Sequence, residues 1–270
     1  MGRKPKFKNV KGIAKAKSTT ISNNDSKSKY RKAVKKSFDS RKPLIENKWF
    51  FPILLSVILL IGSFLLLGNL GNQYLWQDEA ETALLAKTVL SHGIPMAYDG
   101  KNFFSQEFGT DYGKNYAWRW FPWFPYYLLA GFFGIFGIST WTARLPFAVF
   151  GLATIALVYF FSRSLWMSRR SGLIAALFLI LSIPFLILSR QCRYYSPTAF
   201  FAVLGLYGYF NLTENKKYSS IILVLTCTLL FHVHQIFYGI VLLTIFFHAM
   251  IFHRDKMKRI FVFTYFDSHY

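Results

Sequence analysis

The chain is organised around residues 74–87, which read YLWQDEAETALLAK and follow directly on a long apolar run. Asp78, Glu79 and Glu81 place three carboxylates within four residues. Charged groups are costly to hold in lipid, so these acids belong at the water boundary. We therefore expect a helix that lies at the outer membrane surface and presents its acids to a site there.

The same acids indicate where this helix begins and which way it faces. Asp78 and Glu79 suit a first turn, because acids favour the positive end of the helix dipole. A period of 3.6 residues places Asp78, Glu81 and Thr82 on one face and directs Leu84, Leu85 and Val89 towards another. The alternative is an ordinary acidic first turn on an interfacial helix, without a chemical role.

Composition defines the class of protein. Of the 270 residues, 53% are hydrophobic and 20% aromatic, while only 16% are charged. A soluble domain is far less apolar, so these values indicate a polytopic membrane protein. The net charge of +20 is uneven, because residues 1–48 hold 16 of the 32 Lys and Arg and 3 of the 12 Asp and Glu, a net of +13. The excess of positive charge therefore describes a tail and some loops and does not indicate a nucleic-acid-binding domain.

Residues 1–48 are rich in Lys, Ser and Asn and poor in apolar residues. Such a segment buries too little to offset the entropy of ordering, so we expect a disordered basic cytoplasmic tail. Its charges could touch anionic membrane lipid. RNA binding is the alternative, but the aromatic residues that stack on bases are not interleaved there. Positive charge stays inside, so the tail orients the first span with the N-terminus in the cytoplasm.

Hydropathy and charge together predict the topology of residues 49–270. The apolar run from Trp49 to Leu70 is long enough to cross a bilayer, which needs about 20 residues. Residues 122–138 are apolar but short and contain two prolines. If they lie in the interface, the basic patches of the later loops all fall on the tail's side, as the positive-inside rule favours. We thus predict an all-α polytopic bundle with a large extracytoplasmic loop at 71–141 that carries juxtamembrane helices. The six expected spans are 50–70, 142–162, 171–189, 197–212, 218–234 and 236–253.

This topology gathers carboxylates and cations on the outer side, where they could act on a lipid phosphate. Transfer from a lipid-phosphate donor needs a base for the acceptor hydroxyl and cations for the leaving phosphate. Asp78 is the candidate base, and Glu79 is its reserve or its orienting partner. The candidate phosphate clamps are Lys114, Arg119, Arg190 and Arg193. The alternative for each clamp is a long basic side chain that simply reaches the lipid headgroups.

Three further patterns add to this interpretation. Arg190 and Arg193 are three residues apart at a helix end, so we expect them to share a face. Together with Arg144 they stand out as positive charge on the side where it is disfavoured. His232 and His234 form a His-x-His pair, which is weak evidence for zinc without a third ligand, so no metal site is predicted. The aromatic residues of 116–127 could stack on sugar rings, or form the aromatic belt of the interface.

Several of these motifs resemble a known family. Trp76-Gln-Asp78-Glu79-Ala after the first span, a Tyr98-Asp-Gly segment, Lys114 and the run WTARLPFAVFG at 141–151 are similar to the membrane glycosyltransferases of the C-type (GT-C) superfamily. The similarity covers about residues 50–212. Within that superfamily, the branch resembled is that of protein mannosyltransferases and lipid A aminoarabinose transferases.

The resemblance implies an enzyme with a defined set of partners. It implies inverting transfer of a sugar from a polyprenyl-phosphate donor to a protein, lipid or glycan acceptor, without a catalytic metal or other cofactor. It also implies that Asp78 is the catalytic or acceptor-positioning acid. Lys114 takes the place of the Lys in a Lys-Pro-Pro-like motif, although Asn115 and Tyr116 follow it. Family members are longer, so residues 49–270 are expected to be the N-terminal part of such a domain in a multi-pass protein of the cell membrane. The alternatives are a non-catalytic membrane protein, either a transporter or an assembly subunit, and an inactive fragment of the same fold.

Overall fold

The computed structural model describes residues 49–105 and 108–254. Within these ranges the chain forms helices and loops with a few isolated β-bridges and no β-strand. The chain divides after Phe50 into two units, and the features below belong to the second. The predicted all-α bundle is confirmed. The predicted tail, residues 1–48, lies outside the described residues.

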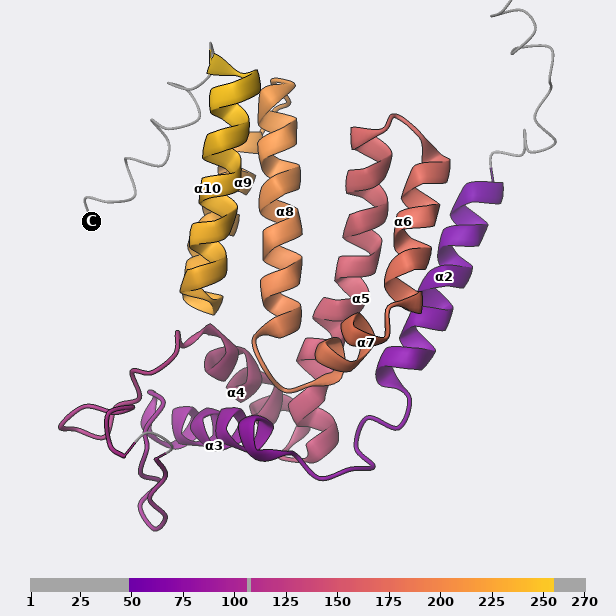
Figure 1. Cartoon of the computed structure of the whole chain (residues 1–270). Helices are drawn as coiled ribbons and strands as arrows, with labels where there is room; N and C mark the ends of the chain where they lie inside the picture. The colour runs from indigo at the N-terminus through magenta and orange to yellow at the C-terminus, as the bar shows by residue number, and fades with distance from the viewer. Residues whose placement is uncertain (1–48, 106–107, 255–270) are drawn as a thin grey trace, which may run out of the picture. The chain divides into compact units, whose positions relative to one another are not determined.

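The long helices run roughly parallel to one another (Figure 1). They are α2 (Phe50–Leu67), α5 (Thr140–Leu165), α6 (Arg169–Leu181), α8 (Tyr195–Thr213), α9 (Ser219–Val233) and α10 (Gln235–Phe252). In the described part, α2, α5 and α10 are long and apolar enough to cross a membrane, and α6 with α7 (Ile183–Arg190) makes a fourth if that bent pair is one span. Helices α8 and α9 take the places of the fourth and fifth predicted spans, but α9 has only 15 residues and α8 includes polar residues such as Asn211 and Thr213. Length and composition thus support three or four of the six predicted spans.

The predicted span 171–189 is broken in the structure. Helix α6 ends at Leu181, and α7 follows after a bend of 68°. The Ser182 hydroxyl accepts a hydrogen bond from the Phe185 N–H at 3.4 Å and so caps the start of α7. Pro184 lies in the first turn of α7, where its missing N–H is tolerated. The local sequence therefore favours a new helix start over a continuous span.

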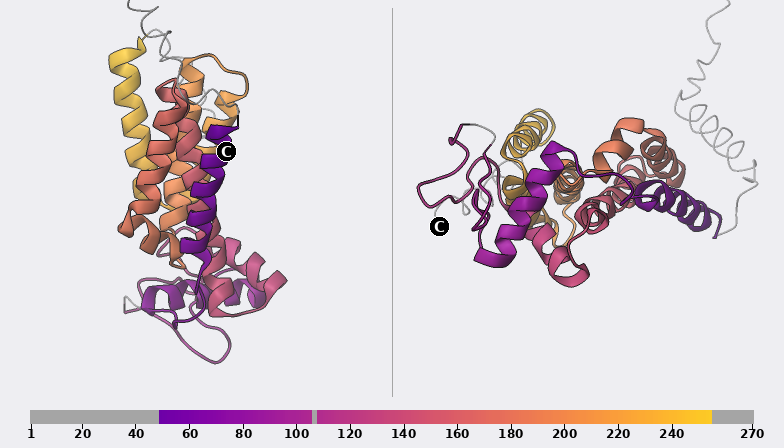
Figure 2. Two further views of the ribbon diagram at one scale, coloured as in Figure 1. Left: turned by 90° about the vertical axis from the view of Figure 1, so that its right-hand side faces the viewer. Right: turned by 90° about the horizontal axis from the view of Figure 1, so that it is seen from below.

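Two further helices, α3 (Gln77–His92) and α4 (Phe124–Phe136), lie across one end of these roughly parallel helices (Figures 1 and 2). Gly93 ends α3 with a φ of 78°, a left-handed conformation that glycine adopts at little cost. Helix α4 has 13 residues, which is short for a membrane span. The prediction that residues 122–138 form a juxtamembrane helix agrees with this placement. The side of the membrane on which the helix lies stays a prediction.

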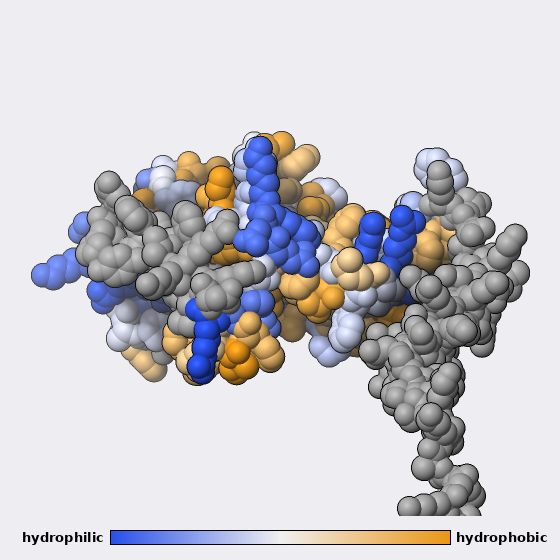
Figure 3. Space-filling view, turned by 90° about the horizontal axis from the view of Figure 1, so that it is seen from above, coloured by the Kyte–Doolittle hydropathy of each residue, from blue (hydrophilic) through white to orange (hydrophobic). Residues whose placement is uncertain are grey.

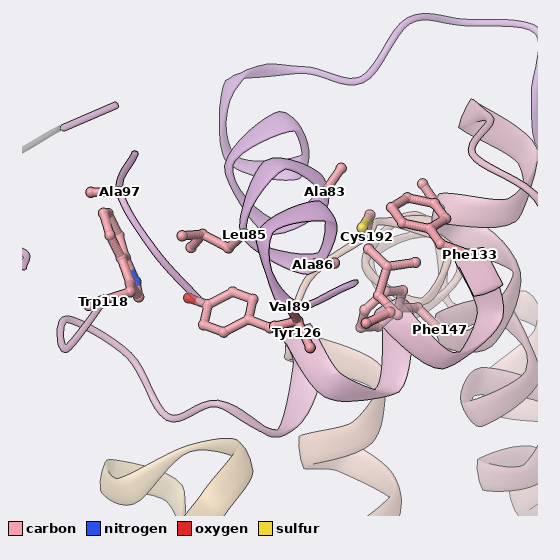
Figure 4. Packing of buried hydrophobic residues seen from close by; sticks show 13 residues of the cluster. Ala83, Leu85, Ala86, Val89, Ala97, Trp118, Tyr126, Phe133, Phe147 and Cys192 are labelled. Carbon is pink, nitrogen blue, oxygen red and sulfur yellow. The ribbon is translucent and has the colours of Figure 1, made fainter. Parts of the chain in front are cut away.

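Three buried apolar clusters hold this unit together. The first joins α3, α4 and the start of α5 and includes Leu85, Trp118, Tyr126 and Phe147 (Figure 4). The second joins α8, α9 and α10, and the third joins α2, α5 and α6. Helix α5 contributes to the first and third clusters, and its Phe150 packs against the second. It is therefore the element on which α3 and its acids are positioned.

Candidate active site

The three acids of α3 differ in their access to solvent. The side chains of Glu79 and Glu81 are 1% and 0% exposed, whereas that of Asp78 is 30% exposed. All three belong to the first turns of one helix, so helical geometry sends Glu79 in a different direction from the other two. Asp78 is the acid of this group that an incoming molecule could reach.

Glu79 is held in a buried ion pair with Arg144 of α5. Its two carboxylate oxygens accept from Arg144 Nε at 2.8 Å and from a terminal guanidinium nitrogen at 2.6 Å. The Cys192 backbone N–H donates to the same carboxylate at 2.8 Å, and the Trp76 N–H does so at 3.4 Å. Of the two roles predicted for Glu79, these contacts favour that of an orienting partner for the neighbouring acid.

Arg144 also binds the chain that leads from α2 to α3. Its guanidinium donates to the carbonyl oxygens of Leu70 at 3.0 Å, Gln73 at 2.9 Å and Tyr74 at 3.1 Å. A guanidinium has five N–H groups, and the two bonds to Glu79 with these three bonds use them all. The pair Glu79–Arg144 therefore fastens residues 70–79 to α5.

A second buried cation, Arg193, joins the other two acids. Its guanidinium contacts the Asp78 carboxylate at 3.3 Å and the Glu81 carboxylate at 3.1 Å. It also donates to the Asp78 carbonyl oxygen at 3.2 Å and lies 3.5 Å from the Thr82 hydroxyl. The predicted common face of Asp78, Glu81 and Thr82 is thus confirmed, and Arg193 is the residue that binds it.

Burial controls the charge state of this cluster. It raises the pKa of Glu81, and the nearby Arg193 partly opposes that rise. One Glu81 oxygen has no hydrogen-bond partner among the described residues, which is costly for an ionised carboxylate. For Arg193, burial lowers the pKa, but Glu81 and Asp78 more than offset this and the pKa is raised. The guanidinium therefore stays charged while it holds Asp78.

Arg190 and Arg193 do not share a helix face, contrary to the prediction. Helix α7 ends at Arg190 and Gln191 adopts an extended conformation, so the three-residue spacing is not helical. Arg190 donates to the carbonyl oxygens of Leu65 and Gly68 at the end of α2. It lines a pocket of about 450 Å³ with Arg144, on the Glu79 side of α3. Arg193 turns instead to the acids of α3.

The remaining predicted clamps lie elsewhere. Arg119 lines a second pocket, of about 390 Å³, with the aromatic residues Trp120, Trp123 and Phe231. Phe121 lines the same pocket and lies under the guanidinium of Arg193, whose central carbon is 5.5 Å from the ring centroid. Lys114 is exposed in the loop between α3 and α4, and within the described ranges no hydrogen bond or ion pair joins it to the three acids.

Two members of the cluster were not among the predicted site residues, although the sequence carried a signal for each. Arg144 stands out in the sequence as positive charge on a disfavoured side, and the helical period places Glu81 on the face of Asp78. His232 and His234 were a possible zinc pair, and within residues 49–105 and 108–254 no group of three or more His, Cys, Asp or Glu is placed to hold a metal ion. His234 packs its ring on Tyr194, with the centroids 4.5 Å apart.

Residues 121–266 match the family model for dolichyl-phosphate-mannose-protein mannosyltransferases. The chain belongs to this family. It is therefore a member of the GT-C membrane glycosyltransferases, as the motifs suggested. The matched residues of this mannosyltransferase-family chain begin after α3. They include Arg144 and Arg193 but not Asp78, Glu79 or Glu81.

Solved structures give a second comparison. The family member described here is similar to the oligosaccharyltransferase of Archaeoglobus fulgidus in its apo form, with a TM-score of 0.52 and 20% identity over 69% of this chain. It matches equally well the same enzyme in complex with an inhibitory peptide and a dolichol-phosphate, at a TM-score of 0.51 and 20% identity over 68% of this chain. The chain spans 24% of the length of those structures, and the likeness is one of fold. Among curated proteins, no match was found.

Proposed function

We propose that this chain takes part in glycosyl transfer from a polyprenyl-phosphate-linked sugar to an acceptor hydroxyl, with Asp78 as the general base. The observation that carries this proposal is the contrast among the three acids of α3. Glu79 and Glu81 are buried, and Asp78 is 30% exposed and held by Arg193. Membership of a mannosyltransferase family supports the reaction class.

The proposed reaction is an inverting displacement. The Asp78 carboxylate accepts the proton of the acceptor hydroxyl, and the resulting oxygen attacks the anomeric carbon from the side opposite the phosphate. The bond between that carbon and the phosphate oxygen breaks, and the lipid phosphate leaves with both electrons. Arg193 keeps the base in place through its ion pair with the Asp78 carboxylate. Glu79, through Arg144, positions the start of α3 and with it Asp78.

Arg119 is the proposed clamp on the leaving phosphate, and the aromatic pocket that it lines supports this role. The pocket that it lines offers Trp120 and Trp123, and such rings can pack on a sugar or an isoprenoid. Phe121 connects this pocket to Arg193, since it lines the pocket and contacts the guanidinium. An Arg offers two parallel donors to a phosphate, which suits a group whose charge grows during the reaction. Lys114 and Arg190 are proposed as further cations that bind the donor phosphate.

We propose that the site faces the outer side of the membrane. The helix ends and turns at the opposite end of the bundle carry Arg163, Arg169, Arg170, Lys216 and Lys217, and the cytoplasmic side is the one enriched in Lys and Arg. A site on the outer side would meet a lipid-linked donor after its sugar has crossed the membrane. The acceptor would then be a protein, a lipid or a glycan of the cell envelope.

Replacement of Asp78 tests the proposal. The full chain and its Asp78→Asn variant are reconstituted in vesicles with a radiolabelled polyprenyl-phosphate sugar and a membrane acceptor extract. We expect sugar transfer to fall about 100- to 10,000-fold, as for the loss of a general base. The matched control is Asp99→Asn, which removes an exposed acid that accepts from the backbone N–H groups of Lys101 and Asn102. Transfer that survives in Asp78→Asn would remove Asp78 from the mechanism, and a wild-type chain without transfer would favour a non-catalytic membrane protein or an inactive fragment of the same fold.

A further inference from the structure

A third pocket lies at the end of the bundle away from α3 and α4. It is formed by the last turn of α5, the turn that follows it, the start of α6 and one side chain of α8, and its volume is about 420 Å³. The lining residues are Phe160, Arg163, Ser164, Met167, Arg169 and Tyr207. Seen from above, this end of the molecule carries strongly hydrophilic side chains beside apolar ones (Figure 3).

The two arginines of this pocket have no acidic partner. Among residues 49–105 and 108–254, no carboxylate lies within ion-pair distance of Arg163 or Arg169. The acid of the α8–α9 turn, Glu214, is paired with Lys216 at 2.6 Å. Lys216 in turn lies 3.5 Å from the hydroxyl of Ser164, a lining residue of the pocket. The pocket therefore combines uncompensated positive charge with a neighbouring cation, which is the electrostatic setting for an anion.

The length of α5 places this pocket at the second membrane surface. Arg144 in the candidate active site and Arg163 in the pocket are 19 residues apart on one helix. At a rise of about 1.5 Å per residue this is about 28 Å, close to the roughly 30 Å of a hydrocarbon core. The side chains of Trp166 and Met167, next to the pocket, are 69% and 88% exposed. An exposed Trp at a helix end is typical of the membrane–water interface.

We propose that this pocket binds the phosphate headgroup of an anionic phospholipid, in the leaflet opposite the one that the candidate active site faces. Arg163 and Arg169 would each donate to the phosphate oxygens, as guanidinium groups do with phosphates. Ser164 and Tyr207 supply hydroxyl groups for the rest of the headgroup. The exposed ring of Phe160 lies where an acyl chain would leave the pocket. The lipid would hold together the ends of α5, α6 and α8, which no protein side chain bridges through an ion pair in the described structure.

Lipid retention measures this site without reference to catalysis. The purified full chain is titrated in neutral detergent with phosphatidylglycerol or with phosphatidylcholine, and bound lipid is counted by native mass spectrometry. We expect the Arg163→Gln, Arg169→Gln double variant to lose about 100-fold in affinity for phosphatidylglycerol, from two lost charge-assisted hydrogen bonds at about tenfold each. The control is the Arg170→Gln, Arg254→Gln variant, which removes the same charge from exposed residues outside the pocket lining.

Each outcome decides for or against the pocket. Loss in the pocket variant, with the control variant close to wild type, supports the proposal. Equal loss in both variants would show that overall charge attracts the lipid and would overturn it. Inorganic phosphate that displaces phosphatidylglycerol at equal concentration would assign the pocket to free anions instead. Thermal unfolding of both variants without lipid checks that they fold. We expect both to fold, because all four arginines are exposed.

Discussion

At the scale of single residues, the cluster on α3 shows how one helix can use neighbouring acids for different purposes. Both carboxylate oxygens of Glu79 accept hydrogen bonds, from Arg144 and from two backbone N–H groups. Glu81 is buried against Arg193 with one oxygen left without a hydrogen bond among the described contacts. Asp78 keeps part of its surface open to solvent. Glu79 and Glu81 are therefore held in structural contacts, and Asp78, also paired with Arg193, is the acid for which we propose a chemical role.

Replacement of Glu79 by Gln should destabilise the protein strongly. The change leaves Arg144 charged in a site where its side chain is only 12% exposed, and breaking a buried pair costs about 3–5 kcal/mol. Denaturant titration in mixed micelles would measure the loss. The double variant Glu79→Gln, Arg144→Met should recover part of it, because no unpaired charge then remains. If the stability losses of Glu79→Gln and of Arg144→Met add up to the loss of the double variant, the pair is not coupled.

Glu81 should make folding stability depend on pH. Its pKa is raised above the usual 4.5 by burial, so between 4.5 and the raised value the folded protein holds a proton that the unfolded chain has released. The contribution of Glu81 to stability is then greatest below pH 4.5 and is lost as the pH rises through the folded-state pKa. Unfolding of wild type and of Glu81→Gln across this range isolates the effect, since the amide cannot ionise. Parallel curves for the two proteins would contradict the raised pKa.

At the scale of elements, α5 is the helix on which the others are aligned, and close contacts fix it against α7. Gly151 of α5 lies so near to α7 that an added Cβ would meet the Ser189 Cβ at 2.6 Å and its hydroxyl at 2.9 Å. Ser189 is followed by Arg190, and the chain then leads to Arg193 in the candidate site. The packing of two helices thus determines where the site's cation stands.

The Gly151→Ala variant tests this contact. We expect a loss of about 1–3 kcal/mol, as for overpacking of a filled interior, and a weaker hold of Arg193 on Asp78. Gly239→Ala in α10 is the matched control, because nothing lies within 4 Å of its added Cβ. There the helix should gain roughly 0.5–1 kcal/mol from the lower flexibility of Ala. Thermal unfolding of both variants in one detergent gives the comparison, and similar shifts would argue against tight packing at Gly151.

The elements also show what sequence reasoning can and cannot reach. The apolar runs and the positive-inside rule were enough to predict the helical bundle and to set residues 122–138 apart from the spans. The period of α3 predicted that Asp78, Glu81 and Thr82 share a face. The break at Ser182 was missed because hydropathy does not register a helix cap inside an apolar run. The topology predicts that the acids and arginines gather on one side, but not which arginine pairs with which acid, because Glu79 and Arg144 are 65 residues apart in sequence and meet only in the folded chain.

At the scale of the whole molecule, the described unit has two polar ends separated by apolar helices. One end holds α3, α4 and the acids, and the other holds the turn between α5 and α6 with its arginines (Figures 1 and 2). The outward surface of α2 is strongly apolar, with Phe64 77% exposed, as suits a face toward lipid. The function proposed here requires that the two ends lie in different compartments.

Labelling of introduced cysteines tests that arrangement. The side chains of Tyr74 near α3 and of Met167 in the α5–α6 turn are 96% and 88% exposed, so cysteines there should react readily. The native Cys192 and Cys227 are buried and should give little background. We expect a membrane-impermeant thiol reagent to label Tyr74→Cys in intact cells and Met167→Cys only after permeabilisation. The reverse pattern would place Asp78 on the cytoplasmic side and end the proposal of an outer-face reaction.

Arg144 donates hydrogen bonds to Glu79 and to the carbonyl oxygens of Leu70, Gln73 and Tyr74. These contacts have a consequence for the binding of acceptors of different size. Any sliding or tilting of α3 would break an ion pair and several hydrogen bonds to main-chain carbonyl oxygens. The Asp78 carboxylate is therefore held in a fixed position relative to the bundle. In the described part of the loop between α3 and α4, backbone hydrogen bonds such as that from the Ala97 N–H to the Tyr116 carbonyl oxygen at 2.8 Å join its two ends, and Ala97 and Trp118 pack in the first buried cluster. Adjustment to a bulky acceptor would therefore fall to the exposed side chains of this loop, such as Phe103 and Tyr116, while the proposed base Asp78 stays in place.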